Sequence, residues 1–243
     1  MNDDLISKFK LPASIIDINA KLRIVDALTC LQDNMCEYFK LLGCDGLTML
    51  PICNAFFVIT KTIVKFVGSA NWLDEIEVKT NIAKKSNIRV NLSNSIYLNK
   101  KPIVLGLQEM CAVDGNDRKL RMVDSTLFPQ DINVGCDNGL AFSKIMVDFD
   151  ESDFVKEIVI DASHLDFYKH TNNVEYARFV LSTLTVDEIS NSDIDTFEIH
   201  YISQCVEGDK VKIYKKVIDN IVYHQMVLNN GQVINKSKLI YKN

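Results

Sequence analysis

The sequence "TNNVEYARFVLSTLTVDEI", residues 171–189, indicates the fold class because it reads as a helix set between extended segments. Its apolar residues recur at helical spacing, so that Val174, Ala177 and Leu181 share one face. The extended stretch "FVKEIVI" precedes it at residues 154–160, and strand-like segments follow it. This half of the chain is therefore predicted to fold as one helix followed by a run of strands.

The first half of the chain has the same order of elements. "ASIIDIN" (residues 13–19) reads as extended, and "KLRIVDALTCLQDNMCEYFKLLG" (residues 21–43) has helical spacing with Gly43 as a stop. Strand-like segments separated by Gly, Asn, Asp and Pro follow between residues 54 and 114. The order of elements therefore indicates an internal repeat.

The spacing of the two halves also matches. Residues 57–68 and 197–208 both run from Phe to Gly without a gap, which pairs Gln204 with Val64. A helix followed by consecutive strands cannot form a parallel βαβ array, because such an array alternates the two. The simplest arrangement is an antiparallel sheet wrapped around one helix in each half of the chain.

We therefore predict an α+β fold with two long helices, at residues 22–42 and 171–189, each wrapped by a curved antiparallel β-sheet. A stretch rich in Gly, Asp and Asn around residues 114–148 is predicted to link the halves. The expected domains are 1–135 and 136–243.

Composition narrows the function classes. The chain of 243 residues is 47% hydrophobic, as folded proteins are, and no apolar run approaches the roughly 20 residues of a membrane helix. Its start, "MNDDLISKFK", lacks the apolar core of a signal peptide. The 7 cysteines are scattered and form no CxxC pair, which indicates reduced thiols. With a net charge of −5, we expect a cytoplasmic protein that neither inserts into membranes nor binds nucleic acid.

Polar residues gather at the start of the second helix, in "HLDFYKHTNNVEY" (residues 164–176). Asp166 lies four residues before His170, and Thr171, Asn172 or Asn173 can cap the helix. Taken from the residues alone, Asp and Asn before a helix are most often turn formers and caps. The spacing of the histidines offers no metal-ligand cluster, so neither a metal nor a cofactor is expected.

This stretch resembles the motif D-L-D-x-N-x-H-V-N-N-x-x-Y of the acyl-ACP thioesterases. The matching positions are Leu165, Asp166, His170, Asn172, Asn173 and Tyr176. Downstream, "IHYISQCVEGDKV" is similar to a family segment that ends in Glu-Cys before a Gly-Asp turn. In the first half, "WLDEIEVKT" from Trp72 is similar to a Trp-Asp-x-Ile-x-Val-x-Thr pattern. The resemblance thus extends over nearly the whole chain.

The resemblance implies a double hotdog fold and a thioester hydrolase that releases a fatty acid from acyl carrier protein in fatty acid biosynthesis. The partners are then acyl carrier protein and its fatty acyl thioester, and a homodimer is left open. The second hotdog is expected to carry the chemistry and the first to shape the acyl pocket.

The resemblance also implies roles for individual residues. Asp166 would act as base or nucleophile, and His170 would hydrogen-bond Asp166 or the attacking water. The N-terminus of the following helix would stabilise the oxyanion, with Asn172 and Asn173 binding substrate. Cys205 belongs to the family's Glu-Cys pair, but a cysteine within a strand is by default a small buried apolar residue, so we do not expect it to be the nucleophile.

Two positions depart from the family. Tyr168 stands where the family has Asn, and its phenol still donates a hydrogen bond. Gln204 stands where the family has Glu, and an amide cannot take up a proton as a base. The alternative function is therefore a non-hydrolytic or weakened hotdog protein that binds acyl thioesters. A hotdog dehydratase or hydratase is a third reading.

Short basic segments at residues 84–85, 100–101 and 118–121 usually mark solvated turns. An acidic carrier protein nevertheless requires a basic docking patch, and these segments are the candidates in a chain that is acidic overall.

Overall fold

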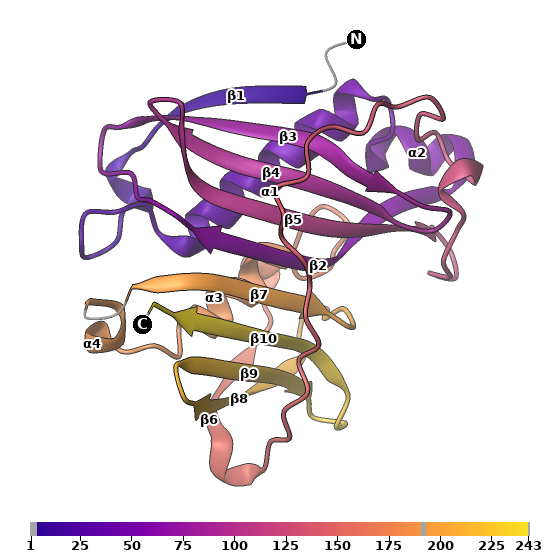
Figure 1. Ribbon diagram of the computed structural model, residues 1–243. Coiled ribbons are helices and arrows are strands. Elements are labelled where there is room, and N and C mark those ends of the chain that lie inside the picture. The colour runs from indigo at the N-terminus through magenta and orange to yellow at the C-terminus, as the bar shows by residue number, and fades with distance from the viewer. Residues whose placement is uncertain (1–3, 191–192, 243) are drawn as a thin grey trace. The chain divides into compact units, whose positions relative to one another are not determined.

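The structure, a computed structural model, describes residues 4–190 and 193–242. The chain forms two compact units, Met1–Ala141 and Phe142–Asn243 (Figure 1). Each unit has an antiparallel sheet, built from β1–β5 in the first unit and β6–β10 in the second, with its main helix on one face. The predicted α+β double hotdog is therefore confirmed.

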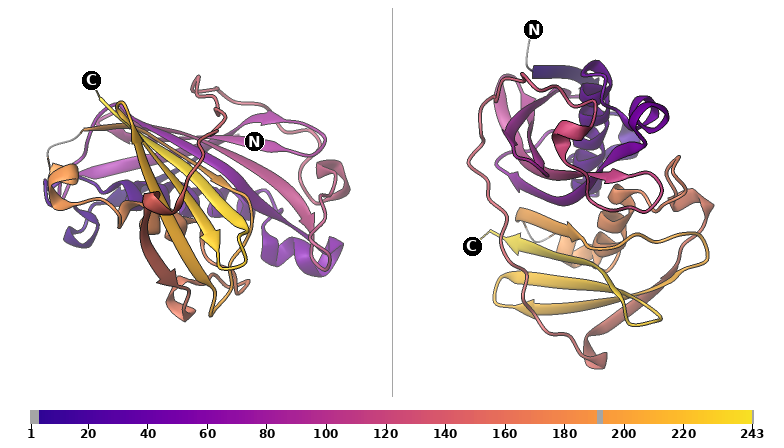
Figure 2. Two further views of the ribbon diagram at one scale, coloured as in Figure 1. Left: turned by 90° about the horizontal axis from the view of Figure 1, so that it is seen from below. Right: turned by 90° about the vertical axis from the view of Figure 1, so that its right-hand side faces the viewer.

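The first unit places its helix α1 against a sheet of strand order β1-β3-β4-β5-β2. Its elements are β1 (Asp4–Lys10), α1 (Ile24–Leu41), α2 (Gly46–Cys53), β2 (Ala55–Phe66), β3 (Glu75–Lys85), β4 (Val90–Leu98) and β5 (Lys101–Asp114). Short 3-10 turns cover Ala13–Ile15 and Val123–Ser125. Helix α1 lies across β1, β3 and β4 on one face of the sheet (Figure 2), where its apolar side chains Leu28, Leu31 and Met35 are buried.

The second unit repeats this plan with the strand order β6-β8-β9-β10-β7. Its elements are β6 (Phe154–Val159), α3 (Asn173–Leu181), α4 (Val186–Ser190), β7 (Ile194–Tyr201), β8 (Lys210–Ile218), β9 (Ile221–Leu228) and β10 (Val233–Tyr241). Short 3-10 turns cover Glu151–Asp153 and Ala162–His164. Read in sequence order, each strand of the second unit occupies the place of its counterpart in the first. The internal repeat is therefore one of topology.

The ungapped alignment of the two halves is wrong in register. After β2 the N–H groups of residues 67–68 both donate to one carbonyl group in β5, and after β7 those of residues 202–203 do the same to one in β10. These paired residues are therefore equivalent. Gln204 consequently corresponds to Ser69, and not to Val64. The matching Phe-to-Gly spacing was a coincidence, because β2 is longer than β7.

The second helix is shorter than predicted. Helix α3 ends at Leu181, where the hydroxyl groups of Ser182 and Thr183 donate back to carbonyls of the last turn. A new start follows, because the N–H of Thr185 donates to Glu188 Oε2 (2.7 Å) and the N–H of Glu188 donates to Thr185 Oγ1 (3.1 Å). This reciprocal cap begins α4, so the predicted single helix over 171–189 is two short ones.

The extended segment predicted at residues 13–19 is also wrong. Residues 4–10 form β1, which pairs with β3, whereas residues 13–19 contain a 3-10 turn and a tight loop. The loop forms because Oδ1 of Asp17 accepts the N–H groups of Asn19 (2.8 Å) and Lys21 (2.9 Å). An aspartate that captures local N–H groups competes with strand pairing.

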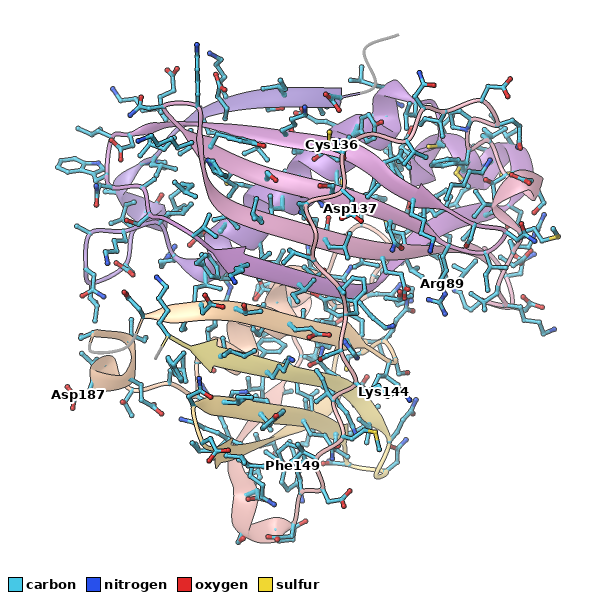
Figure 3. The ribbon with its side chains drawn as sticks, in the orientation of Figure 1. Arg89, Cys136, Asp137, Lys144, Phe149 and Asp187 are labelled. Carbon is cyan, nitrogen blue, oxygen red and sulfur yellow. The ribbon has the colours of Figure 1, made fainter. Side chains whose placement is uncertain are left out.

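The segment between the units is part of the first unit for most of its length. Phe128 is fully buried and meets the rings of Phe39 and Phe57 edge-on. Gly135 N–H donates to the carbonyl of Ile82 (2.8 Å) on the face of the sheet opposite α1. Cys136 and Asp137 therefore lie over that face (Figure 3). The stretch predicted to be a linker is ordered against the sheet in this region.

A chain of buried polar side chains joins α1 to the sheet beneath it. Asn34 Nδ2 donates to Thr80 Oγ1 (2.7 Å), Thr80 Oγ1 donates to Asn94 Oδ1 (2.7 Å), and Asn94 Nδ2 donates to Gln108 (2.9 Å). Buried polar groups of this kind are stable because each has a partner.

The second unit has a less complete version of this chain. Thr183, at the same distance from its helix start as Asn34, bonds His224 Nε2 through Oγ1 (2.9 Å). Because the Thr183 hydroxyl donates to the carbonyl of Val180, His224 must donate to it, which leaves Nδ1 without a proton. That Nδ1 is buried and has no partner among the described residues. Burial, reinforced by the charge of Lys215, lowers the pKa of His224 to about 3.

His224 predicts a loss of stability in acid. The folded chain keeps this imidazole neutral down to a pH of about 3, whereas the unfolded chain binds a proton below a pH of about 6.5. In this window the unfolded state holds more protons, so stability falls as pH falls, by up to about 1.4 kcal/mol per pH unit. We expect His224→Gln, which keeps a donor for Thr183, to reduce the difference in unfolding free energy between pH 7 and pH 5 by roughly 2 kcal/mol.

Urea unfolding of both chains at the two pH values measures this difference. The same pH dependence in His224→Gln and in the unmodified chain would show that His224 is not the group that is protonated.

Candidate functional site

A tight turn held by Asp166 leads into α3. The N–H of Asp166 donates to the carbonyl of His170 (2.8 Å), and Asp166 Oδ1 accepts the N–H groups of Tyr168 (2.8 Å) and His170 (3.2 Å). Lys169 has φ +63°, the left-handed conformation that closes such a turn. The three predicted residues of this turn therefore lie together, with the Asp166 carboxylate at its centre.

The start of α3 follows directly. Asn172 is the N-cap, and its side-chain oxygen accepts the N–H of Val174 (3.0 Å). Asn173 is the first residue of the helix and is half-buried. The first turn of α3 keeps the positive end of the helix dipole close to the Asp166 turn. One of the three residues predicted to cap the helix therefore does so.

The second predicted segment meets the helix start at Cys205. The carbonyl of Cys205 accepts from the backbone N–H of Thr171 (3.0 Å) and from its Oγ1 (3.2 Å). The N–H of Cys205 donates to the hydroxyl of Tyr176 (3.0 Å). Gln204, the preceding residue, is exposed. The fold thus brings residues 204–205 to the end of the Asp166 turn, although they lie far from it in sequence.

The thiol of Cys205 is not poised for attack. Its side chain is completely buried, and burial raises the pKa of the thiol to about 11, against the opposing effect of a hydrogen bond from Tyr176. The thiolate is the nucleophilic form of cysteine, so a protonated thiol of this kind is unreactive at neutral pH. The geometry favours a structural role for Cys205.

The first unit contains the same turn, which sequence reasoning missed. Asp17 N–H donates to the carbonyl of Lys21 (2.8 Å), and Asp17 Oδ1 accepts the N–H groups of Asn19 and Lys21. Ala20 has φ +59°, as Lys169 does in the second unit. The signal was present, because "ASIID" at residues 13–17 and "ASHLD" at residues 162–166 share their Ala, Ser and Asp.

The two turns differ in the side chains that they present. The first unit has Asn19 and Lys21 where the second has Tyr168 and His170. At the helix start, Arg23 of the first unit makes no side-chain cap, whereas its counterpart in the second unit does. A carboxylate beside an imidazole at a helix N-terminus can take a proton from water and stabilise an oxyanion. Of the two turns, the second has both an aspartate and a histidine directly before its helix.

The described residues give no sign of a metal centre or of a membrane span. Between residues 4 and 242, residues 191–192 excepted, no group of three His, Cys, Asp or Glu side chains is placed to hold a metal ion. No helix in the same ranges is long and apolar enough to cross a membrane.

Comparison with known proteins gives the same family for both parts of the chain. Residues 3–128 match the acyl-ACP thioesterase N-terminal domain, and residues 148–243 match the acyl-ACP thioesterase C-terminal domain. No curated protein sequence matches the chain.

Solved structures share the fold over its full length. An acyl-ACP thioesterase from Bacteroides thetaiotaomicron superposes with a TM-score of 0.89 at 16% identity, covering 99% of this chain and 98% of its own. A 12:0-ACP thioesterase from Umbellularia californica superposes with a TM-score of 0.85 at 14% identity, covering 100% of this chain and 98% of its own. At these identities the likeness shows a common fold.

The burial of Cys205 predicts that its thiol resists alkylation. In the folded chain we expect iodoacetamide at neutral pH to modify the exposed Cys136 and to leave Cys205 unmodified, since Cys205 is buried and its pKa is about 11. Mass spectrometry of the digested protein measures both sites, and labelling in urea is the control. If Cys205 reacts as fast as Cys136, it is an accessible thiolate and its assignment as structural is wrong.

Proposed function

This chain belongs to the acyl-ACP thioesterase family, and we propose that it hydrolyses its substrate at the Asp166 turn of the second unit. Family models match residues 3–128 and 148–243, so membership extends over nearly the whole chain. The chain is accordingly a thioester hydrolase that acts on acyl-ACP. The observation that carries the proposal is that Asp166 and His170 belong to one turn, joined by the bond from the His170 N–H to Asp166 Oδ1, whereas the counterpart of His170 in the first unit is Lys21.

The carboxylate of Asp166 can hold the turn and act on the substrate at once. An ionised carboxylate accepts about four hydrogen bonds, and Oδ1 takes the two backbone N–H groups of the turn. The carboxylate then removes a proton from water as general base. Alternatively it attacks the thioester carbon as nucleophile, the thiolate leaves, and water hydrolyses the resulting acyl anhydride to release the fatty acid and restore the carboxylate. His170 orients the water or Asp166.

The first turn of α3 receives the oxyanion in this proposal. As hydroxide adds to the thioester carbon, negative charge develops on the carbonyl oxygen, and the positive end of the helix stabilises it. Asn172 and Asn173, at the cap and at the first helical position, contact the substrate. Collapse of the intermediate expels the thiolate, which takes up the proton removed from water.

Tyr168 and Gln204 stand where the family has Asn and Glu. Their side chains support the proposed chemistry as hydrogen-bonding groups, Tyr168 by its phenol and Gln204 by its amide. Gln204 is exposed, so its amide is accessible to water and substrate. Because the amide of Gln204 cannot act as a base, Asp166 alone removes the proton from water in this proposal.

The first unit, within the predicted domain 1–135, shapes the acyl pocket in this proposal, and the second, within 136–243, carries the chemistry. The Asp17 turn has no histidine, which supports placing the chemistry in the second unit. A cytoplasmic location, a role in fatty acid biosynthesis and a homodimer stay predictions.

Two of the basic segments form a single candidate patch for docking the acidic carrier protein. Val123 N–H donates to the carbonyl of Asn87 (2.8 Å), which brings the end of the β3–β4 hairpin next to residues 118–121. Arg89 lies at this end of the first unit (Figure 3). Residues 100–101 lie at the opposite end of β4 and form no part of it.

Several cations of this patch already have carboxylate partners. Lys85 pairs with Asp124 (2.8 Å) and Arg121 pairs with Asp114 (2.9 Å). Lys84 is exposed and makes no ion pair in the described part of the chain. Arg118 is also exposed and lies over the ring of Phe56 without a carboxylate partner among the described residues. We therefore expect Lys84 and Arg118 to attract the carrier.

Replacing Asp166 tests the site. Asp166→Asn removes the charge and the proton acceptor while keeping an oxygen for the turn, so we expect kcat to fall roughly 100-fold or more with dodecanoyl-ACP. KM should change little, because the apolar surface is untouched. Steady-state kinetics on the purified chain measures both.

Asp17→Asn is the matched control, because it makes the same change in the equivalent turn of the first unit. It should leave kcat within about twofold and lower stability to a similar extent. Full activity of folded Asp166→Asn, or an equal loss in Asp17→Asn, would sink the proposal.

Salt tests the docking patch. Because the carrier protein would be attracted electrostatically, kcat/KM for acyl-ACP should fall more steeply between about 0.05 and 0.3 M NaCl than kcat/KM for the same acyl-CoA. Lys84→Glu should flatten the acyl-ACP dependence, whereas Lys101→Glu at the other end of β4 should not. An identical salt dependence for both substrates would show that the patch plays no part.

A further inference from the structure

Two side chains of the second unit hold the backbone of Cys205 against the helix start. Thr171 Oγ1 adds a bond to the Cys205 carbonyl beside the bond from its own N–H. The Tyr176 hydroxyl accepts the Cys205 N–H at 3.0 Å. We name Thr171 and Tyr176 the Cys205 clamp. Both residues are buried, so these bonds are shielded from water.

The clamp has no counterpart in the first unit, although the backbone there is the same. Leu22 N–H donates to the Ala70 carbonyl (2.9 Å), just as Thr171 N–H does to that of Cys205. Leu22 occupies the place of Thr171, and the position of Tyr176 is taken by Ala27. Neither side chain has a polar atom with which to bond the backbone. The turn therefore forms without a clamp, and the extra bonds of the second unit serve some other purpose than folding the turn.

The clamp acts on a segment that the sheet does not hold. Strand β7 ends at Tyr201 and β8 begins at Lys210, so Cys205 lies outside the ladders. A buried backbone N–H requires a partner, and Tyr176 supplies one from the second turn of α3. Edge-on contacts with Phe179 and Tyr201 fix the Tyr176 ring. Cys205 is thereby held in place by α3 and not by the sheet.

We propose that Thr171 and Tyr176 are positioning residues, which fix residues 204–205 relative to the Asp166 turn so that both segments face one thioester. The inference rests on the proposed function, since it assumes that the Asp166 turn is the site of hydrolysis. A displacement of about 1 Å at a reacting centre costs up to roughly 100-fold in rate, so the two side-chain hydrogen bonds of the clamp have a kinetic purpose.

Tyr176→Phe tests the clamp. It removes one hydroxyl and keeps the ring and its edge-on contacts, so we expect kcat with dodecanoyl-ACP to fall about tenfold and KM to stay within about twofold. Thr171→Val keeps the backbone bond to Cys205 and removes the side-chain bond. It should lower kcat less, by about threefold. If Tyr176→Phe fails to fold, Thr171→Val tests the clamp in its place.

Tyr214→Phe is the matched control. Its hydroxyl donates to Glu151 (3.1 Å) within the same unit but away from the Asp166 turn, so its loss should leave kcat unchanged. Assays run well below the unfolding midpoint of every variant keep a loss of stability from being read as a loss of rate.

Amide hydrogen exchange tests the hydrogen bond of the Cys205 N–H without relying on turnover. In Tyr176→Phe, peptides that cover residues 202–208 should exchange faster than in the unmodified chain, because the Cys205 N–H has lost its partner. Unchanged exchange, or a kcat equal to that of Tyr214→Phe, overturns the clamp. Full turnover in Asp166→Asn would instead overturn the proposed site, which separates the two failures.

Discussion

Each of the two main helices starts from one interaction, an aspartate carboxylate that accepts two backbone N–H groups from the turn ahead of it. Asp17 makes it in the first unit and Asp166 in the second. The turn reverses the chain, so that the residue before the helix cap donates to the segment that follows β2 or β7. The helix is thereby directed across its sheet and its apolar face is buried. The two aspartates therefore hold the backbone of residues 17–21 and 166–170 directly ahead of each helix.

Because the turn occurs twice, architecture and chemistry can be separated within one chain. The first turn shows what the carboxylate does for the fold alone, since Asn19 and Lys21 beside it give no imidazole. The second turn adds His170, a capping asparagine and the bonds of Thr171 and Tyr176 to Cys205. All of these additions lie between residues 170 and 176, and Thr171 and Tyr176 among them contact Cys205. That concentration on one helix start is the physical basis for placing hydrolysis in the second unit.

The sequence was sufficient for the elements that depend on local pattern. The helical spacing of Leu28, Leu31 and Met35 predicted α1, and alternation and turn residues predicted most strands. It failed where a side chain overrides the pattern, as at Thr185, whose cap with Glu188 divides the second helix. The candidate site was found as a motif. Its contacts were not, because the bond between Thr171 and Cys205 joins segments that only the folded sheet brings together.

The most direct test gives the second turn the side chains of the first. The quadruple variant Phe167→Ile, Tyr168→Asn, Lys169→Ala, His170→Lys copies residues 18–21 and keeps Asp166, so the turn should form as it does around Asp17. The account predicts a thermal unfolding midpoint within a few degrees of that of the unmodified chain, together with a loss of acyl-ACP hydrolysis of roughly 100-fold, since the histidine of the turn is gone. A folded variant that hydrolyses acyl-ACP at the original rate would contradict it.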